Sequence, residues 1–328
     1  MNIVVIGHGM VGHKFLEQLH ALGVADANVT VLCEEPRAAY DRVHLSEFFS
    51  GKSAEDLSLV APGFFEASGF TLRLAARAAA VERRERTVTT ADGEVIPYDR
   101  LVLATGSAPF VPPVPGRDRP HCFVYRTIED LEAMQASAAR SRTGVVVGGG
   151  LLGLECAKAL RDLGLETHVV EFAPRLMAVQ VDDGGGRVLR SKIEDLGVQV
   201  HTGRNTLEIT DGATARHRMV FADGTHLETD MIVFSAGIRP RDEIARQCAL
   251  AIGPRGGVAV DDHCRTSDRS VYAIGECASW REQTFGLVAP GYDMARVAAR
   301  HIAGEAEAAF GGADLSTKLK LMGVDVAS

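Results

Sequence analysis

Two stretches of this sequence, IVVIGHGMVGHKF at residues 3–15 and GVVVGGGLLGLEC at residues 144–156, have the same form. Each runs from a short apolar segment into the spacing G-x-G-x-x-G and then into residues typical of a helix. That order predicts a strand, a tight turn and a helix, in which a nucleotide pyrophosphate lies on the N–H groups of the helix start. Because the pattern occurs twice, the sequence predicts two dinucleotide-binding domains.

The first copy predicts a strand over residues 3–6, a helix over 14–22 and a second strand over 29–33. Its first glycine permits the sharp turn, the second lets a pyrophosphate approach the backbone, and the third lets helix and strand pack closely. The second strand leads to Glu34, about 20 residues past the third glycine, where such a fold binds an adenosine ribose. The three glycines are Gly7, Gly9 and Gly12.

The second copy predicts a strand over 145–147, a helix over 154–163 and a strand over 167–170 that ends at Glu171. A carboxylate there accepts hydrogen bonds from both ribose hydroxyls and repels a 2′-phosphate, so NADH is favoured over NADPH. Two alternatives are open for the side chain of Arg175: it binds a pyrophosphate or, as the less favoured alternative, a 2′-phosphate. The three glycines are Gly148, Gly150 and Gly153.

The duplication extends beyond the glycines. TADGEVIPYDRLVLATGSAP at 90–109 and FADGTHLETDMIVFSAGIRP at 221–240 share a D-G hairpin turn, an apolar strand and a final small-Gly pair. The sequence therefore predicts an α/β protein with two Rossmann-like domains.

Composition excludes several function classes. With 328 residues and 46% hydrophobic content, the chain can form two cores. The net charge is −8 with the two signs interspersed, which argues against nucleic-acid and membrane partners. No signal peptide or apolar span is visible, so we expect a cytoplasmic protein. The six cysteines form no C-x-x-C or C-x-x-x-x-C pair, so we expect no metal site and assign redox chemistry to an organic cofactor.

Further motifs carry a family resemblance. ATG at 104–106 and YAIGEC at 272–277 resemble the other flavin contacts of the pyridine-nucleotide reductase superfamily, which binds FAD on the first unit and NADH on the second. Longer strings are more specific and resemble the N-terminal flavin module of NADH-dependent nitrite reductase large subunits. These strings lie at 34–49, 125–134, 171–186, 286–301 and 317–328.

The resemblance implies a glutathione-reductase-like arrangement of two three-layer domains, each with a β-meander. Proline-rich APFVPPVPG at 108–116 marks the first crossing between them, and GIRPR at 237–241 marks the return. The implied domains are 1–112 for FAD, 113–239 for NAD(H), 240–312 for FAD again and 313–328 as the start of an interface domain.

The resemblance also implies the binding residues. Glu155 is the one catalytic candidate. An equally weighted alternative is that Glu155 only forms a salt bridge on its helix. The implied FAD contacts are Gly7, Gly9, Met10, Val11, Gly12, Glu34, Glu35, Arg42, Ser46, Ala78, Ala104, Thr105, Gly106, Gly275 and Glu276. The implied NAD contacts are Gly148, Gly150, Leu151, Leu152, Gly153, Glu155, Glu171, Arg175 and Gly237.

The implied activity is hydride transfer from NADH to FAD, then single-electron transfer to an iron–sulfur or siroheme centre for nitrite reduction outside this chain. One alternative is an NADH-dependent ferredoxin or rubredoxin reductase, which Glu47 disfavours because those flavoproteins often place lysine there. Another is a flavin-bearing NADH sensor or interaction protein. Glu276 replaces the superfamily's usual aspartate, a mild change that keeps the acceptor. The acceptor and the oligomeric state stay open.

Smaller expectations concern single residues and the chain end. We expect His8 and His13 to face solvent or cap the helix, and the helix start beside Cys277 favours a lowered thiol pKa. Residues 319–326 alternate like one strand of an uncompleted sheet. A fragment of a longer protein is therefore expected, ahead of a separate natural subunit or an incomplete sequence.

Overall fold

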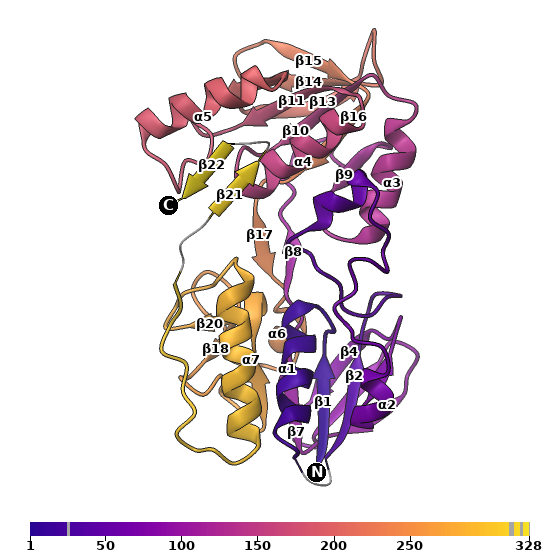
Figure 1. Ribbon diagram of the computed structural model, residues 1–328, viewed down its shortest axis with the longest axis vertical. Coiled ribbons are helices and arrows are strands. Elements are labelled where there is room, and N and C mark those ends of the chain that lie inside the picture. Colours follow the sequence, from indigo (N-terminus) through magenta and orange to yellow (C-terminus); the bar gives the residue numbers. More distant parts are fainter. Residues whose placement is uncertain (25–26, 315–317, 322–323, 328) are drawn as a thin grey trace. The chain divides into compact units, whose positions relative to one another are not determined.

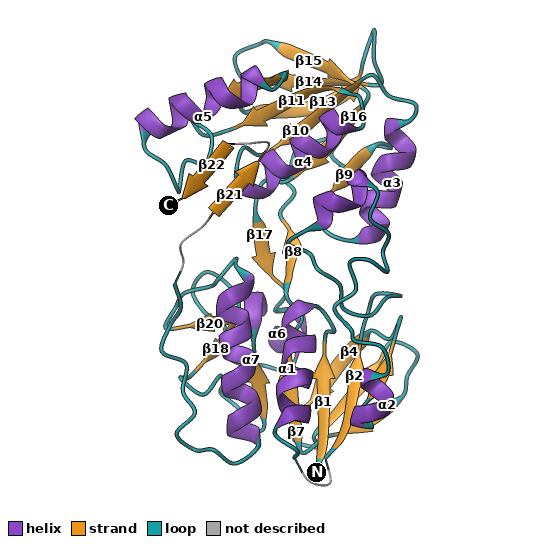
Figure 2. Ribbon diagram, viewed as in Figure 1, coloured by secondary structure: helices purple, strands orange, loops and turns teal. Residues whose placement is uncertain are grey.

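The computed structural model describes residues 1–24, 27–314, 318–321 and 324–327. It divides into two compact units (Figures 1 and 2). Unit 1 comprises Met1–Asp41, Leu57–Ala108 and Arg239–Leu315, and unit 2 comprises Arg42–Asp56, Pro109–Ile238 and Ser316–Ser328.

Unit 1 contains both strands and helices. Its strands are β1 (Asn2–Ile6), β2 (Asn28–Leu32), β3 (Thr71–Arg73), β4 (Ala78–Glu82), β5 (Thr87–Thr90), β6 (Val95–Pro97), β7 (Arg100–Leu103), β18 (Val258–Val260), β19 (Val271–Ala273) and β20 (Ala278–Trp280). Its helices are α1 (Met10–Ala21), α2 (Phe64–Ser68), α6 (Glu243–Gln247), α7 (Val288–Ile302) and the short 3-10 helix η2 (Gly275–Cys277). The chain passes between the units along β8 (Ser107–Pro109) and β17 (Ile238–Pro240).

The centre of unit 1 is a parallel sheet in the order β19-β7-β1-β2-β3. Ile3, Val4 and Val5 are at most 1% exposed, as expected for a parallel strand covered on both faces. Helices α1 and α7 pack side by side, and the antiparallel meander β4-β5-β6 shares the same apolar core (Figure 2). Unit 1 is therefore built from a central parallel sheet, helices and an antiparallel meander.

Unit 2 repeats this design. Its strands are β9 (Cys122–Val124), β10 (Thr143–Val147), β11 (Glu166–Glu171), β12 (Val198–Thr202), β13 (Thr206–Asp211), β14 (His217–Phe221), β15 (His226–Thr229), β16 (Met231–Phe234), β21 (Lys318–Leu321) and β22 (Val324–Ala327). Its helices are α3 (Ile128–Ala138), α4 (Leu151–Asp162), α5 (Asp183–Asp195) and the 3-10 helix η1 (Leu45–Ser50).

The sheet of unit 2 has the order β12-β11-β10-β16-β9, with the separate meander β13-β14-β15. In both sheets the strand before the glycine turn is central, the next two strands of the sheet lie on one side of it and the strand after the meander lies on the other, so the predicted duplication and the α/β class are confirmed. Both predicted D-G turns join meander strands, Asp92-Gly93 between β5 and β6 and Asp223-Gly224 between β14 and β15.

Three expectations need correction or comment. The helices expected from residues 14 and 154 begin earlier, at Met10 and Leu151. The prediction of a single strand over 319–326 is wrong, because β21 and β22 form an antiparallel pair. Residues 322–323 lie outside the described part of the chain. The predicted cofactor domains stay a prediction, although residues 42–56 pack in unit 2 rather than with the rest of 1–112.

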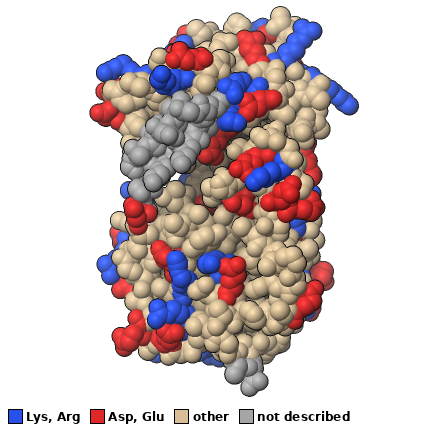
Figure 3. Space-filling view, in the orientation of Figure 1, with Lys and Arg blue, Asp and Glu red and all other residues tan. Residues whose placement is uncertain are grey.

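The surface mixes both charge signs. On the face drawn in Figure 3, lysine and arginine side chains are interspersed with aspartate and glutamate. Within the described residues, no helix combines the length and apolarity needed to cross a bilayer.

Candidate functional site

The glycine turn of unit 1 follows β1 directly. Gly7 has φ +107°, and a Cβ atom added to it would collide with the carbonyl oxygen of Ala104. A Cβ atom on Gly12 would collide with the carbonyl oxygen of Gly7. At Gly9 no atom of the described residues lies within 4 Å of the Cβ position. The first and third glycines are thus required by the protein's own packing, whereas the second faces open space.

The glycine turn of unit 2 has the same three properties. Gly148 has φ +122°, and its Cβ position overlaps the carbonyl oxygen of Ser235. The Cβ position of Gly153 overlaps the carbonyl oxygen of Gly148, and the described part of the chain again places no atom within 4 Å of the Cβ position of Gly150. Two independent turns therefore leave the backbone bare at the place where a pyrophosphate must approach.

Both turns end at a helix start suited to an anion. Gly9 is the N-cap of α1 and Gly150 the N-cap of α4, and neither supplies a side-chain cap. No acidic residue lies in the first turn of either helix. Their backbone N–H groups and the positive ends of the helix dipoles favour negative charge there. The first helical residues are Met10 and Val11 in α1 and Leu151 and Leu152 in α4.

The structure brings most predicted FAD contacts of unit 1 together around its glycine turn. The Gly275 Cβ position lies 3.2 Å from a Val11 methyl group, so η2 packs on the start of α1. The Thr105 hydroxyl donates to the Arg241 carbonyl at 2.6 Å, and the Arg241 N–H donates to the Gly106 carbonyl at 2.9 Å. Thus the end of β7, η2 and residue 241 surround one turn.

Three residues of this cluster were not predicted from the sequence. Ser107 donates to a Glu276 carboxylate oxygen at 2.7 Å and so orients that acid. Arg241 forms an ion pair with Glu34, the predicted ribose ligand. Gly291 of α7 lies 3.2 Å, at its Cβ position, from the Gly275 Cα. For Gly291, the only sequence feature that pointed to a role was the APG sequence within residues 286–301. The Ser107–Glu276 and Arg241–Glu34 pairs join residues far apart in the chain, so no local pattern predicts them.

The other predicted FAD residues are more dispersed. Glu35 accepts a hydrogen bond from the Tyr40 hydroxyl at 2.8 Å, and Ala78 begins β4. Arg42 and Ser46 belong to unit 2, where the Arg42 guanidinium donates to the Arg126 carbonyl at 3.1 Å. Contacts of these residues with a flavin stay a prediction.

Glu171 ends β11 beside the second glycine turn. One carboxylate oxygen accepts the Gly149 N–H at 2.5 Å, and the other accepts the Ala173 N–H at 2.6 Å. Two backbone donors therefore hold the carboxylate at the strand end where the ribose acid is expected.

Arg175 is engaged within its own loop. Its Nε donates to the Val181 carbonyl at 3.0 Å, its Nη1 pairs with Asp183 at 2.7 Å, and its Nη2 donates to the Ala178 carbonyl at 3.3 Å. The guanidinium thus ties residues 175–183 together, and its predicted contact with a dinucleotide stays a prediction.

Glu155 lies in α4, close to the second glycine turn. Burial raises the pKa of its carboxyl to about 7, and the charge of nearby His44 partly opposes that rise. His44 occupies the N-cap position of η1, which packs against α4 within unit 2. The side chain can therefore hold or release a proton near neutral pH.

Two local expectations were wrong. His8 and His13 are each only 3% exposed, and the Nδ1 of His8 accepts the Ala39 N–H at 3.1 Å. Phe64 and Phe65 pack edge-on against these rings and keep them from solvent. Cys277 is fully buried, so burial raises the pKa of its thiol instead of lowering it. All six cysteines lie in the described part of the chain, and none of them forms a disulfide bond.

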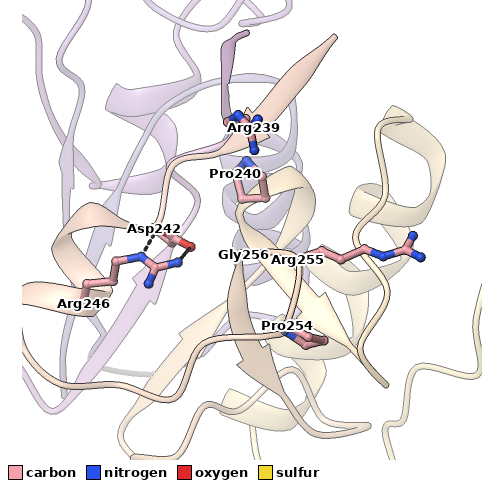
Figure 4. Close-up of a pocket in the computed structure, with 7 residues that line it drawn as sticks. All are labelled: Arg239, Pro240, Asp242, Arg246, Pro254, Arg255 and Gly256. Atoms are coloured by element: carbon pink, nitrogen blue, oxygen red, sulfur yellow. Dashed lines mark hydrogen bonds and ion pairs between the residues drawn. The ribbon is translucent and has the colours of Figure 1, made fainter.

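A separate cavity of about 300 Å³ lies in unit 1 (Figure 4). Asp242 in its wall accepts two hydrogen bonds from Arg246, at 2.8 and 2.9 Å, and one from the Gly257 N–H at 2.7 Å. None of the predicted cofactor residues is among those that line it. Its lining is Arg239, Pro240, Asp242, Arg246, Pro254, Arg255 and Gly256.

Comparisons with known proteins agree with this geometry. The family model for pyridine nucleotide-disulphide oxidoreductases matches residues 1–301. The chain is 58% identical, over 99% of its length, to the nitrite reductase (NADH) large subunit of Escherichia coli (strain K12), but spans only 39% of that protein. It is 30% identical to rubredoxin-NAD(+) reductase of Pseudomonas putida, covering 88% of this chain and 74% of that one.

A solved structure shows the same fold. The NAD-dependent persulfide reductase from A. fulgidus superimposes with a TM-score of 0.92 at 27% identity, covering 98% of this chain and 62% of that one.

Proposed function

Because this chain belongs to the pyridine nucleotide-disulphide oxidoreductase family, we propose that it is an FAD-dependent NADH:acceptor oxidoreductase module. The observation that carries the proposal is the pair of glycine turns, each with an open middle glycine at a helix start. Each turn is followed by an acid at the end of the next strand. FAD supplies the redox chemistry when bound, since it takes a hydride from NADH and releases electrons singly.

Unit 1 is the proposed FAD site. Its glycine turn binds the pyrophosphate, and Glu34 binds the adenosine ribose. Glu276, oriented by Ser107, lies on η2 beside the start of α1, where it can accept hydrogen bonds from the ribityl chain. The many segments around this turn suit a cofactor that stays bound.

Unit 2 is the proposed NADH site. Glu171 is held by two backbone N–H groups in a position to accept the ribose hydroxyls, and its charge opposes a 2′-phosphate. Arg175 is already bonded to Asp183 and two carbonyls, so it is not free to compensate that charge. We therefore propose NADH in preference to NADPH, with Glu155 as the protonatable group near the nicotinamide end.

The proposed electron acceptor is an iron–sulfur or siroheme centre outside this chain, as the similarity to the nitrite reductase large subunit suggests. A second candidate is a separate acceptor protein, favoured by the similarity to rubredoxin-NAD(+) reductase over most of that enzyme's length. Both share the same first half-reaction.

An anaerobic titration tests the proposal. The purified chain, reconstituted with FAD, should bleach at about 450 nm when NADH is added. It should then reduce ferricyanide rapidly but leave nitrite unchanged, with NADPH much less effective than NADH. A chain that cannot hold FAD, or a bound flavin that NADH does not reduce, would refute the proposal.

A further inference from the structure

Phe172 is an exposed aromatic beside the proposed ribose acid. It follows Glu171 directly and is 74% exposed. Among the large apolar side chains that the described residues expose, it is the only aromatic one. No ring or cation–π partner of Phe172 is found within the described part of the chain. Its ring therefore contributes little to the core.

The backbone around Phe172 is nevertheless held firmly. The Ala173 N–H donates to Glu171, and the Ala173 carbonyl accepts the Gly203 N–H at 2.9 Å. The Glu171 carbonyl accepts the Arg204 N–H at 2.9 Å. Both neighbours of Phe172 are thus tied to the segment that follows β12. An exposed ring on a fixed backbone is a preformed surface, which loses little conformational freedom on binding.

We propose that Phe172 is the platform on which the adenine ring of NADH stacks, an inference that rests on the proposed function. The ribose whose hydroxyls reach Glu171 carries adenine on the adjoining carbon, so the base must lie within one sugar of that carboxylate. Phe172 is the next residue along the chain and offers a flat apolar face there. Stacking on it would cover both the base and the exposed ring.

The size of the effect follows from similar contacts. Base–aromatic stacking contributes about 1–3 kcal/mol per base, which corresponds to about a 5- to 150-fold change in affinity. Phe172→Ala should raise the KM for NADH and the inhibition constant of ADP-ribose by a factor in that range. The rate of flavin reduction at saturating NADH should be unchanged, because the nicotinamide end is untouched.

Two controls isolate the adenine contact. Reduced nicotinamide mononucleotide lacks the adenosine half, so its KM should be the same in wild type and Phe172→Ala. Val179 lies on the same loop and is 93% exposed, so Val179→Ala is the matched control and should change neither constant. Phe172→Trp should restore the affinity for ADP-ribose.

The outcomes are distinguishable. An equal ADP-ribose inhibition constant in wild type and Phe172→Ala, with wild-type flavin still reduced by NADH, overturns the stacking role alone. Loss of self-association in Phe172→Ala without a change in either constant would identify a second copy of the chain as the occupant and overturn it also. Wild-type flavin that NADH does not reduce refutes the proposed function itself.

Discussion

Alanine substitutions at the glycines of one turn should separate folding from ligand binding. Gly148 and Gly150 are two residues apart, but their surroundings are opposite. A methyl group on Gly148 would overlap the Ser235 carbonyl, and φ there is +122°. A methyl group on Gly150 would meet none of the residues that the structure describes within 4 Å, and φ there is −82°.

The expected magnitudes follow from those contacts. Gly148→Ala combines backbone strain of about 1–3 kcal/mol with overpacking of about 1–3 kcal/mol, so unfolding free energy should fall by about 2–6 kcal/mol. Gly150→Ala should cost about 1 kcal/mol or less, since it only replaces glycine at an N-cap. Its methyl group would, however, occupy the approach of the pyrophosphate, and an overlap of about 1–3 kcal/mol raises the KM for NADH about 5- to 150-fold.

Urea denaturation gives the stabilities, and anaerobic flavin reduction gives the KM. Gly9→Ala is the matched control in unit 1, because Gly9 has φ −87° and equally open surroundings. It should lower retention of FAD while leaving ADP-ribose binding intact, whereas Gly150→Ala should do the reverse. Gly150→Ala with an unchanged KM, or with a stability loss equal to that of Gly148→Ala, would refute the reasoning.

Two further predictions concern buried titratable groups. The folded pKa of Glu155, about 7, lies above its ordinary value of 4.5, so the stability it contributes below pH 4.5 is lost as pH rises through 7. Glu155→Gln has no such ionisation, so its unfolding free energy relative to that of wild type should increase by up to about 3 kcal/mol between pH 5 and about 8, as measured by urea denaturation. If the two proteins lost stability in parallel over this range, the burial of the carboxyl would be contradicted. Burial lowers the pKa of His8 from 6.5 to about 3. The folding stability that neutral His8 contributes is therefore fully present above pH 6.5 and is lost as pH falls toward 3. His8→Asn keeps an acceptor for the Ala39 N–H and should flatten that acid decline, and an unchanged slope would show that His8 is not its source.

Local patterns were sufficient for much of the fold. The β-branched runs before each glycine turn and the two D-G turns identified the central strands and the meanders, because each signal lies within a few residues. The helix starts were placed too late for a physical reason. Gly12 and Gly153 lie in the first helical turn and have poor helix propensity, yet the close carbonyl of the first glycine admits no other residue.

Non-local packing set the limits of prediction. His8 is buried because Phe65 packs against it from α2, and Cys277 is buried because η2 packs against α7 and the end of β7. Residues 42–56 join unit 2 through packing of η1 on α4 and α3, which no short pattern reveals. The pairing of Arg241 with Glu34 is likewise formed by residues far apart in the chain.

The two turns are alike, so the turns themselves cannot decide which nucleotide each binds. Their surroundings differ. In unit 1, residues 239–315 return to place Gly275, Glu276 and Gly291 around the turn, which suits a cofactor retained through many cycles. In unit 2, the acid is held by backbone donors and followed by the exposed ring of Phe172, which suits a nucleotide that enters and leaves. Retention needs enclosure and exchange needs an open platform, and on this ground we propose that the same folded motif binds FAD in unit 1 and NADH in unit 2.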